Sequence, residues 1–430
     1  MASNTGRLGK ASWIKEVAWG TYLTPTRPLS LTQESIENKV EHVEDGRFIG
    51  KIFTTDMIAV SEQVDGSVDV TAHPQEVGPL VDMALGKNDA PGTAPSGRLL
   101  VWYTGADAYA HVINTLGVMA GFAGATVGTA VSKWSFDTAN ASYDTLAELA
   151  TAINAVADWN AYYTGVSTAL TAGIGNFTAL IIKTNGQLSG MVKNIASISA
   201  TTKEHHIYPA GATDTEPSMS ICVDRTIGTG QALGFAGAKV NSFAIAIASK
   251  TIVKMTVGLN AKSETSGKTY PTIIIPSDKP YVASRARVFV NGTEATEIKD
   301  LNITLNNNLD ISNVVGSVYV SEQIRQGATL QVSGSMNFNA TDWTSNYALY
   351  KADTPIEMYV YIENADYADA VNEVKYSILI KLAAVKLTKS PTPLLSGPNR
   401  LTSSIEGTCV EKSGVNHVDF YVVDTETTAY

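Results

Sequence analysis

The feature that most constrains the fold of this chain is an internal repeat. The stretch that starts at Leu31 shares its chemistry with the stretch that starts at Leu301, although few residues are identical. Three anchors coincide at a constant offset of 270 residues: Leu31 with Leu301, Asn38 with Asn308, and Gly46 with Gly316. Self-similarity over such a distance indicates that one structural unit occurs twice in the chain.

A second pair of matching segments follows the anchors. Residues 58–71 match residues 328–339 at an offset of 268: Val64 with Val332, Gly66 with Gly334, Ser67 with Ser335, Val68 with Met336, and Val70 with Phe338. A difference of two residues between the two offsets is what a hairpin loop of slightly different length produces. The two segments therefore extend the repeat beyond the anchors.

Both of these segments alternate between apolar and polar residues with a period of two. This pattern predicts a strand with one buried face and one solvent-facing face. The faces predicted to be buried carry Ile58, Val60, Val64, Val68 and Val70 in the first copy, and Ala328, Leu330, Val332, Met336 and Phe338 in the second. Both segments exceed the usual strand length of about five or six residues, which favours the wall of a barrel or tube.

A short helix is predicted after each long strand. The first lies within residues 73–87, where Pro74 suits the first turn and Gly86 the C-terminal cap, and the second lies within residues 341–355. Further strands are predicted at residues 218–224, 376–382, Phe243–Ala248 and Thr251–Leu259, and Asn291–Gly292 predicts a tight hairpin turn. The sequence thus predicts a mainly β fold of two tandem sandwich units, each with a short flanking helix and a long hairpin.

Residues 105–204 interrupt the first copy and are rich in Ala, Thr and Gly. Apolar residues at helical spacing predict a helix over Tyr143–Trp159, with Ser142 or Asp144 as its cap. The uncharged stretch Val112–Ser132 is diluted by Gly and Thr, so it favours β or loop structure over a membrane span. This region is predicted to be a small inserted domain, either α+β or β.

The composition fits a folded chain of more than one domain. With 430 residues the chain exceeds the size at which a single core stops growing, about 250–300 residues. Its formal net charge of −10 argues against binding nucleic acid through phosphate neutralisation, which requires clustered Lys and Arg. The two cysteines, Cys222 and Cys409, lie in strand-like runs and are predicted to be buried free thiols.

No arrangement of residues in the sequence points to catalysis. His205 and His206 are adjacent, so on a strand they would point to opposite faces, and we interpret them as part of a surface turn rather than as metal ligands. Gly228, Gly230 and Gly234 miss the dinucleotide-binding pattern by one position. We therefore predict no enzyme activity, no cofactor and no metal site.

Several segments together resemble the tail tube proteins of tailed bacteriophages. They are residues 14–36, similar to that family's N-terminal arm; 64–86, similar to its long strand and short helix; 297–338, similar to its asparagine-rich strand, glycine turn, loop and return strand; and 234–262. The resemblance covers most of residues 14–104 and 205–430 but not the insertion. It implies a β-sandwich flanked by a helix, with long hairpins that join neighbouring chains into a continuous barrel.

The resemblance implies a structural function. Rings would stack into a hollow tube that carries the tape-measure protein and later the viral DNA, with tail terminator and tip proteins as further partners. The protein would be part of the virion tail, assembled in the host cytoplasm. Because the family's plan is a six-fold ring of single units, two units per chain imply a trimer with pseudo-six-fold symmetry. A hexamer with one unit lining the lumen is the alternative.

The polar faces of the two long strands would then line the lumen. They carry Gln63, Asp65, Ser67, Asp69 and Thr71 in the first copy, and Thr329, Gln331, Ser333, Ser335 and Asn337 in the second. Acidic and neutral polar groups without Lys or Arg would not hold a phosphate backbone, so DNA would slide past them without specific binding.

The domain organisation expected from the repeat and the resemblance has six parts. They are an N-terminal arm (1–30), the first part of the first tube unit (31–104), an inserted decoration-like domain (105–204), the second part of the first unit (205–265), a connecting hairpin region (266–300) and the second unit (301–430). The insertion is expected to project outward. Two alternatives remain: another virion structural protein, either sheath or decoration, and a glycan-binding or adhesive β-protein.

Overall fold

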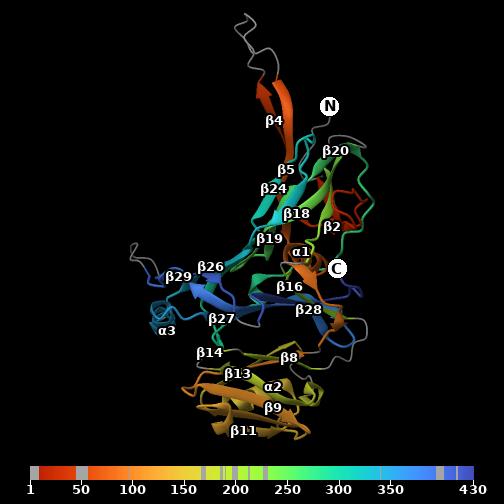
Figure 1. Cartoon of the computed structure of the whole chain (residues 1–430). Coiled ribbons are helices and arrows are strands. Elements are labelled where there is room, and N and C mark those ends of the chain that lie inside the picture. The colour runs from red at the N-terminus through yellow and green to blue at the C-terminus, as the bar shows by residue number, and fades with distance from the viewer. Residues whose placement is uncertain are drawn as a thin grey trace, which may run out of the picture.

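In the computed structural model the chain is a mainly β protein, as the sequence predicts, and the described residues include three short α-helices. The structure describes residues 9–44, 57–95, 97–165, 171–184, 187–188, 190–195, 202–211, 214–225, 231–338, 340–393, 401–412 and 415–430. Figure 1 shows a projecting hairpin at one end, a β-rich body in the middle and a separate β domain at the other end.

The body is built around one continuous antiparallel sheet, called here the long sheet. Its strands lie in the order β3 and β4, β5, β19, β18, β23, β26, β29, β28. Their bounds are β3 Leu31–Glu34, β4 Glu37–Glu44, β5 Met57–Thr71, β19 Lys254–Ala261, β18 Ala232–Ala248, β23 Ile298–Asn306, β26 Thr329–Asn337, β29 Thr402–Cys409 and β28 Val374–Leu387. Both halves of the sequence therefore contribute to a single sheet.

Two groups of covering strands pack on the apolar face of the long sheet. The group around the first half of β18 contains β1 Lys10–Lys15, β2 Arg27–Leu29, β17 Met219–Asp224 and β20 Ser263–Lys268. The group around β28 contains β21 Ala286–Val290, β22 Thr293–Glu294, β27 Ile356–Asp369, β30 Val418–Asp424, β16 Lys203–Pro209, β6 Gly86–Asn88 and β7 Gly92–Thr93. Apolar side chains of the long sheet and of both groups form one hydrophobic core.

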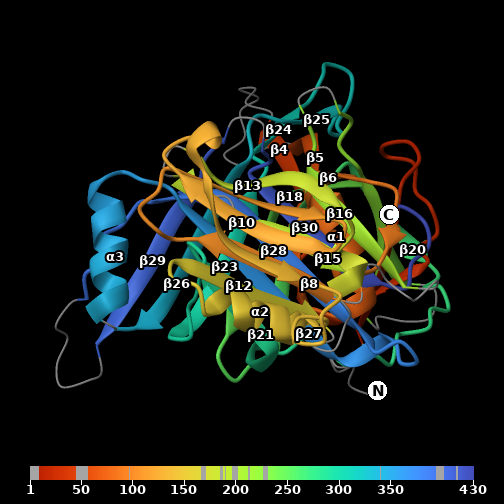
Figure 2. The same ribbon diagram turned by 90° about the horizontal axis from the view of Figure 1, so that it is seen from below.

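Helix α1 (Pro74–Leu85) follows β5 and is buried in this core, not set against its flank. Pro74 occupies the first turn, and Gly86 ends the helix with a φ of 92°, as the sequence predicts. The second predicted helix is α3 (Ala340–Lys351), which lies at the side of the molecule in Figure 2. The turn at Asn291–Gly292 is also confirmed, because both residues have positive φ and connect β21 to β22.

The paired strands β4 and β5 form a hairpin that projects from the body (Figure 1). The part of β5 inside the body follows the predicted alternation, since Val64, Val68 and Val70 are buried. The prediction that Ile58 and Val60 are buried is wrong: their exposed fractions are 56% and 41%. The alternation continues along the strand, but beyond the body no second layer covers it within this chain.

A second hairpin, formed by β24 (Leu309–Ser312) and β25 (Glu322–Arg325), leans against the first. The backbone N–H of Glu62 on β5 donates to the carbonyl of Val318 at 2.7 Å. The side-chain amide of Asn313 donates to the hydroxyl of Ser61 at 3.0 Å. The two hairpins therefore form one projecting arm with contributions from both halves of the sequence.

The separate domain begins with β8, which pairs with β12 and β15 and, among the described residues, not with the long sheet. Its elements are β8 Gly97–Tyr103, β9 Tyr109–Thr115, β10 Val118–Gly124, β11 Val131–Asp137, α2 Leu146–Asn154, β12 Trp159–Gly165, β13 Phe177–Thr184, β14 Gln187–Leu188 and β15 Met191–Ile195. Short 3-10 turns lie at Val127–Thr129, Thr171–Ile174 and, in the body, Ala283–Arg285. Two small sheets and α2 enclose a core of their own.

The structure refines two predictions for this domain. The cap of α2 is Thr145, whose backbone N–H and hydroxyl donate to the Glu148 carboxylate, and neither Ser142 nor Asp144 has that role. The uncharged stretch 112–132 lies in β9, β10 and β11 and the turns between them, as the β interpretation predicts. Among the described residues, no helix has the length and apolar character needed to cross a membrane.

An aromatic contact seats this domain on the body. Trp102 of β8 stacks on Phe289 of β21 at 5.6 Å between ring centroids and meets Tyr359 of β27 edge-on at 5.3 Å. Beneath them the buried Glu357 carboxylate accepts hydrogen bonds from Trp102 Nε1 at 3.2 Å, from the Gly190 N–H at 2.9 Å and from the Tyr359 hydroxyl at 2.9 Å. The domain is thus attached through covering strands, on the side of the body away from the exposed face of the long sheet.

Candidate functional site

One face of the long sheet carries the side chains that the sequence singled out. Residues directly opposite each other in an antiparallel ladder point to the same side of the sheet. Asp69 lies opposite Thr256, which lies opposite Ala244. Ala244 lies opposite Thr304, which lies opposite Gln331. This row of opposed residues connects β5 to β26 across three intervening strands.

The alternation along β5 and β26 extends the row to all ten candidate residues. They are Gln63, Asp65, Ser67, Asp69 and Thr71 on β5, and Thr329, Gln331, Ser333, Ser335 and Asn337 on β26, and none of them is buried. The structure thus brings the ten side chains together on one continuous surface, called here the polar face. Their common side depends on β19, β18 and β23, which the sequence alone does not place between the two long strands.

Hydrogen bonds hold many of the polar groups on this face. The Thr256 hydroxyl donates to Asp69 at 2.7 Å, and Lys39 of β4 donates to Asp65 at 2.6 Å. The hydrogen bond and the charge of Asp65 raise the pKa of Lys39, which stays protonated well above neutral pH. The carboxylates of this face are therefore partly neutralised by neighbours on the same sheet.

The expectation of a surface without Lys or Arg holds for β5 and β26 but not for the whole face. Lys39 lies on β4, Lys254 lies opposite Thr71, and Lys386 of β28 lies on the same side. Lys386 pairs with Asp353 at 2.6 Å. These lysines could not be foreseen because the sequence does not reveal which strands neighbour β5 and β26. The polar face is a mixed surface in which most lysines have an acidic partner.

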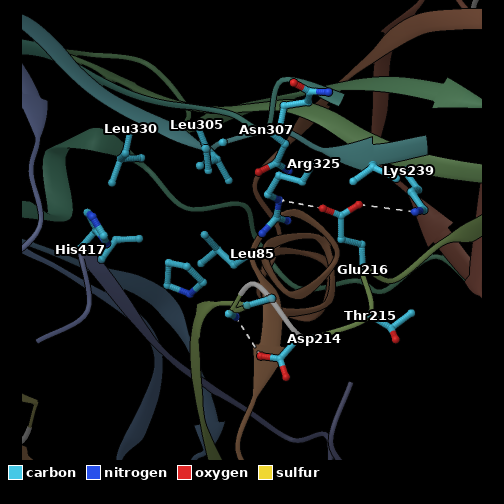
Figure 3. A pocket seen from close by; sticks show the side chains of 18 of the residues that line it. Leu85, Asp214, Thr215, Glu216, Lys239, Leu305, Asn307, Arg325, Leu330 and His417 are labelled. Atoms are coloured by element: carbon cyan, nitrogen blue, oxygen red, sulfur yellow. Dashed lines mark hydrogen bonds and ion pairs between the residues drawn. The ribbon is translucent and has the colours of Figure 1, made fainter. Parts of the chain in front are cut away.

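A cavity of about 1040 Å³ lies where the base of the β24–β25 hairpin meets the end of α1 (Figure 3). Glu216 forms an ion pair with Arg325, whose Nε lies 3.1 Å from it, and accepts a hydrogen bond from Lys239 Nζ at 3.4 Å. Burial lowers the pKa of Arg325, and the charge of Glu216 opposes that effect. Leu85, Leu305 and Leu330 also line the cavity, which therefore combines an ion cluster with apolar side chains.

Polar side chains beside this cavity join the two halves of the chain. The Asn307 amide donates to the carbonyls of Ala84, on α1, and Val240, on β18, at 3.0 and 2.8 Å. Gln323 of β25 is 2% exposed, and neither its amide nitrogen nor its amide oxygen has a partner among the described residues. The surroundings of the cavity thus serve as a structural joint between α1, β18 and the second hairpin.

The interpretation of the histidine pair as a surface turn is wrong. His205 and His206 lie on β16, and their side chains take opposite faces of that strand as adjacent residues must. His205 is fully buried beside Asp424, at 3.1 Å. Burial lowers the pKa of His206, but hydrogen bonds to Asp419 and Asp89 outweigh this and raise it overall.

The other residues that the sequence analysis considered are the two cysteines and the three glycines near residue 230. Cys222 and Cys409 are buried and free, as predicted. Gly228 and Gly230 lie outside the described residues, and Gly234 lies in β18. In the part of the chain that the structure describes, no group of three or more metal-binding side chains is arranged to hold an ion.

One buried carboxylate escaped the sequence analysis. Glu76 in the first turn of α1 is 3% exposed and accepts hydrogen bonds from the Ser30 N–H at 3.0 Å and the Ser30 hydroxyl at 2.7 Å. Burial raises its pKa to about 7, although the bonds from Ser30 act in the opposite direction. The signal available in the sequence was an acidic residue in the first turn of a short helix that is otherwise mostly apolar.

A family model described as "Phage tail tube protein" matches residues 6–409. The search of curated proteins gave no match. A solved structure described as "Crystal structure of the receptor binding domain" is 8% identical, with 91% of this chain and 93% of that chain covered and a TM-score of 0.11. A likeness at that TM-score carries no argument about fold or function.

Proposed function

The chain belongs to the phage tail tube protein family, and from that premise we propose that two tandem tube units in each chain build a ring whose lumen is lined by the polar face. The protein is a structural subunit of the phage tail and a component of the virion, not an enzyme. The family match favours this function over a sheath, a decoration protein or a glycan-binding protein.

The strand pairings support two equivalent units. Seven antiparallel pairings recur: β1·β2 as β21·β22, β1·β17 as β21·β27, β3·β5 as β23·β26, β5·β19 as β26·β29, β17·β18 as β27·β28, β18·β19 as β28·β29, and β18·β20 as β28·β30. A helix follows the long strand in each set, α1 after β5 and α3 after β26. Shared topology at this level is the expected result of a duplicated unit.

The ladder registers favour offsets slightly different from those of the sequence anchors. β5 ends three residues before α1 and β26 ends three residues before α3, which relates Asp69 to Ser335 by 266 residues. Gln33 lies opposite Asp69 and Asp300 lies opposite Ser335, so β3 relates to β23 by 267. The anchors gave 268 and 270. For the long strand the offset changes from 268 to 266. Because this difference is even, the polar residues of the strand stay on the same face.

These relations support revised boundaries for the proposed parts. The first unit comprises residues 10–95 and 202–268, so the N-terminal arm supplies two of its strands. The inserted domain comprises residues 97–195, because β8 pairs within it. The second unit starts at β21 and comprises residues 286–424.

The continuous sheet supports a ring of three chains. Each chain supplies eight strand positions to the long sheet, four from each unit, and the ladder between β18 and β23 joins the two units. Three such chains give six units, which is the number implied by the resemblance described above. Closing the sheet into a barrel would remove its free edges, the usual solution for long strands with unpaired backbone groups. A hexamer of chains is the alternative.

The polar face is the surface that we assign to the lumen. The observation that carries this proposal is the row of opposed residues from β5 to β26, because it places polar groups of both units on one uninterrupted side. With carboxylates, amides and hydroxyls beside mostly paired lysines, this side offers no cluster of free cations to a phosphate backbone. DNA and the tape-measure protein would pass along it, and terminator and tip proteins would contact the ends of the tube.

The inserted domain would project outward from the tube. It is seated on β21 and β27 through Trp102, and those strands lie on the side of the core opposite the polar face. A decorating module or a module that contacts the host surface would both occupy this position.

Electron microscopy of assembled tubes tests the proposal. Cross-sections should have three peripheral densities, one for each inserted domain, around an inner barrel with approximate six-fold symmetry. Six peripheral densities in one ring would replace the trimer by the hexamer. An inner wall formed by the covering strands would overturn the assignment of the lumen.

A further inference from the structure

The ladder within the chain offers a template for the contact between chains; this inference rests on the proposed tandem units. Strand β18 pairs with β23 from Ser242 to Ala248 and from Asp300 to Asn306. If the units are equivalent, the counterpart of this half of β18 in the second unit meets β3 and β4 of the next chain. The chemistry of that counterpart therefore determines how readily rings close.

The segment of the second unit that corresponds to residues 242–248 of β18 lies directly after β28. It is not a strand in the free chain. Ser242 lies opposite Gly258, and the offset of 148 between β19 and β29 relates Gly258 to Glu406. The Thr388 N–H donates to the Glu406 carbonyl at 2.8 Å, so Thr388 occupies the place of Ser242 at an offset of 146. β28 nevertheless ends at Leu387, and residues 388–393 form no strand.

Two prolines account for this difference. Successive residues of a strand direct their backbone N–H groups to opposite edges. The Thr388 N–H faces β29, so the backbone positions 389, 391 and 393 face the next chain. In the template the three outward positions are Phe243, Ile245 and Ile247. Their counterparts are Lys389, Pro391 and Pro393, and the two prolines have no N–H to donate.

The other groups of this segment are engaged locally. The Pro391 carbonyl, which could still accept a bond from the next chain, receives the hydroxyl of Ser403 on β29. The Thr392 N–H donates to the Ser390 hydroxyl oxygen at 3.4 Å, and the Ser390 and Thr392 hydroxyls lie 2.8 Å apart. These polar groups thus have local partners in place of the ladder partners that a continuation of β28 would have.

The opposite edge of the long sheet is complementary to it. Among the described residues, β3 and β4 have β5 as their ladder partner and no strand on their second edge, where the Arg225 guanidinium donates to the Ile36 carbonyl. Applying the template with its offsets of 146 and 267 places Ser390 opposite Glu37 of the partner subunit.

We propose that residues 388–393 form a guarded edge that binds residues 34–39 of a second copy of this chain. Pro391, Pro393 and the bond from Ser403 keep the edge from pairing as strongly as the seam inside the chain. Free chains therefore remain unassembled at concentrations at which a full ladder would join them. Proline on an exposed edge is a known protection against uncontrolled strand pairing.

Replacing both prolines tests the guard. The variant P391V/P393V restores two backbone donors at each seam, and we expect the concentration at half-assembly to fall about tenfold, or about 1.4 kcal/mol per seam. Sedimentation velocity measures the change, and P276V, in a loop outside any strand, is the matched control. An unchanged distribution for a P391V/P393V chain with wild-type far-ultraviolet circular dichroism would overturn the guard.

A cross-link tests the edge independently of folding effects. Ser390→Cys and Glu37→Cys in one chain should form disulfides between chains in assembled tubes and none in the free chain. Thr329→Cys with Glu37→Cys is the control that should not cross-link. Tubes that form without the Ser390–Glu37 cross-link would refute this edge while leaving the proposed function intact. Failure of the wild-type chain to form tubes would count against the proposed function itself.

Discussion

Glu76 and Glu357 are carboxylates that the fold keeps out of water, each at 3% exposure. Glu357 has three donors around it, supplied by the inserted domain and by its own strand. Within the described part of the chain, Glu76 has the two donors of Ser30. A buried carboxylate with few donors carries a larger desolvation cost when charged, and this agrees with the pKa of about 7 that burial gives to Glu76.

The substitution Glu76→Gln should make the stability of the free chain less dependent on pH. The ordinary pKa of 4.5 is raised to about 7 in the folded chain, so the folded state holds a proton that the unfolded state has lost. The contribution of Glu76 to stability is therefore largest below pH 4.5 and declines as pH rises to about 7. At pH 8 the variant should be more stable than the wild type by on the order of 2–3 kcal/mol, and at pH 4 the two should agree.

Urea unfolding at a series of pH values measures this difference. Glu41→Gln, on the exposed hairpin strand β4, is the control and should leave the pH profile unchanged. A stability gain of the Glu76→Gln variant that is equal at pH 4 and pH 8 would show that the effect is unrelated to proton binding.

At the scale of elements, two additions to the sandwich differ in how they are held. The inserted domain is fixed to the covering strands by buried aromatic rings around Trp102. The arm formed by β4, β5, β24 and β25 instead presents apolar side chains to solvent, among them Val43 and Ile58, which lie opposite each other. One addition is complete within the chain, whereas the other needs contacts from outside it.

Trp102→Ala should destabilise the body together with the inserted domain. The substitution removes a fully buried ring and leaves one donor to Glu357 missing, so we expect a loss of roughly 3–5 kcal/mol in unfolding free energy. Thermal or urea denaturation provides the measurement. Leu116→Ala, at an 87% exposed turn of the same domain, should change stability little. Equal effects of the two substitutions would contradict the buried contact.

Val43→Asp with Ile58→Asp should separate folding from assembly. Both side chains are more than half exposed in the free chain, so the unfolding free energy should stay within about 0.5 kcal/mol of the wild type. Tube formation should be lost because the arm must bury these side chains against neighbours. Leu116→Asp with Val127→Asp is the control in the inserted domain and should assemble normally. Normal tubes from the arm variant would exclude the arm from the assembly contacts.

At the scale of the whole molecule, the long sheet separates two environments. Its apolar face supports α1 and the covering strands, and its polar face remains open over both proposed units. The inserted domain lies beyond the covering strands, far from the projecting arm in Figure 1. One chain thus combines a polar sheet face, a core and a separate domain in successive layers.

Lysines placed on the polar face should slow the passage of DNA. Asp65→Lys, Asp69→Lys and Ser333→Lys together create unpaired cations in contact with phosphates, and we expect ejection from assembled particles to slow severalfold and to recover at high salt. Dye-based ejection kinetics report the rate. Ser135→Lys with Asp137→Lys, on the exposed strand β11, is the control. Unchanged kinetics for the triple variant would argue against a lumenal position.

The sequence predicted local structure better than long-range arrangement. Period-two alternation and turn residues located β5, β26 and α1, because these signals depend on neighbouring residues. The burial of Ile58 could not be predicted, because it depends on where the body ends rather than on the pattern of the strand. The strand order between β5 and β26 was also inaccessible, since ladder partners lie up to two hundred residues apart. For the same reason the repeat was recognised while its alignment was displaced by two or three residues.

Joining β18 to β23 within one polypeptide has a consequence for the mechanics of the proposed ring. Three of its six seams would form during folding, without the loss of translational freedom that separate subunits incur on meeting. The other three would open first under tension, so breaks in the wall should occur at every second unit. A tube stretched until it fails should therefore release whole two-unit chains rather than single units.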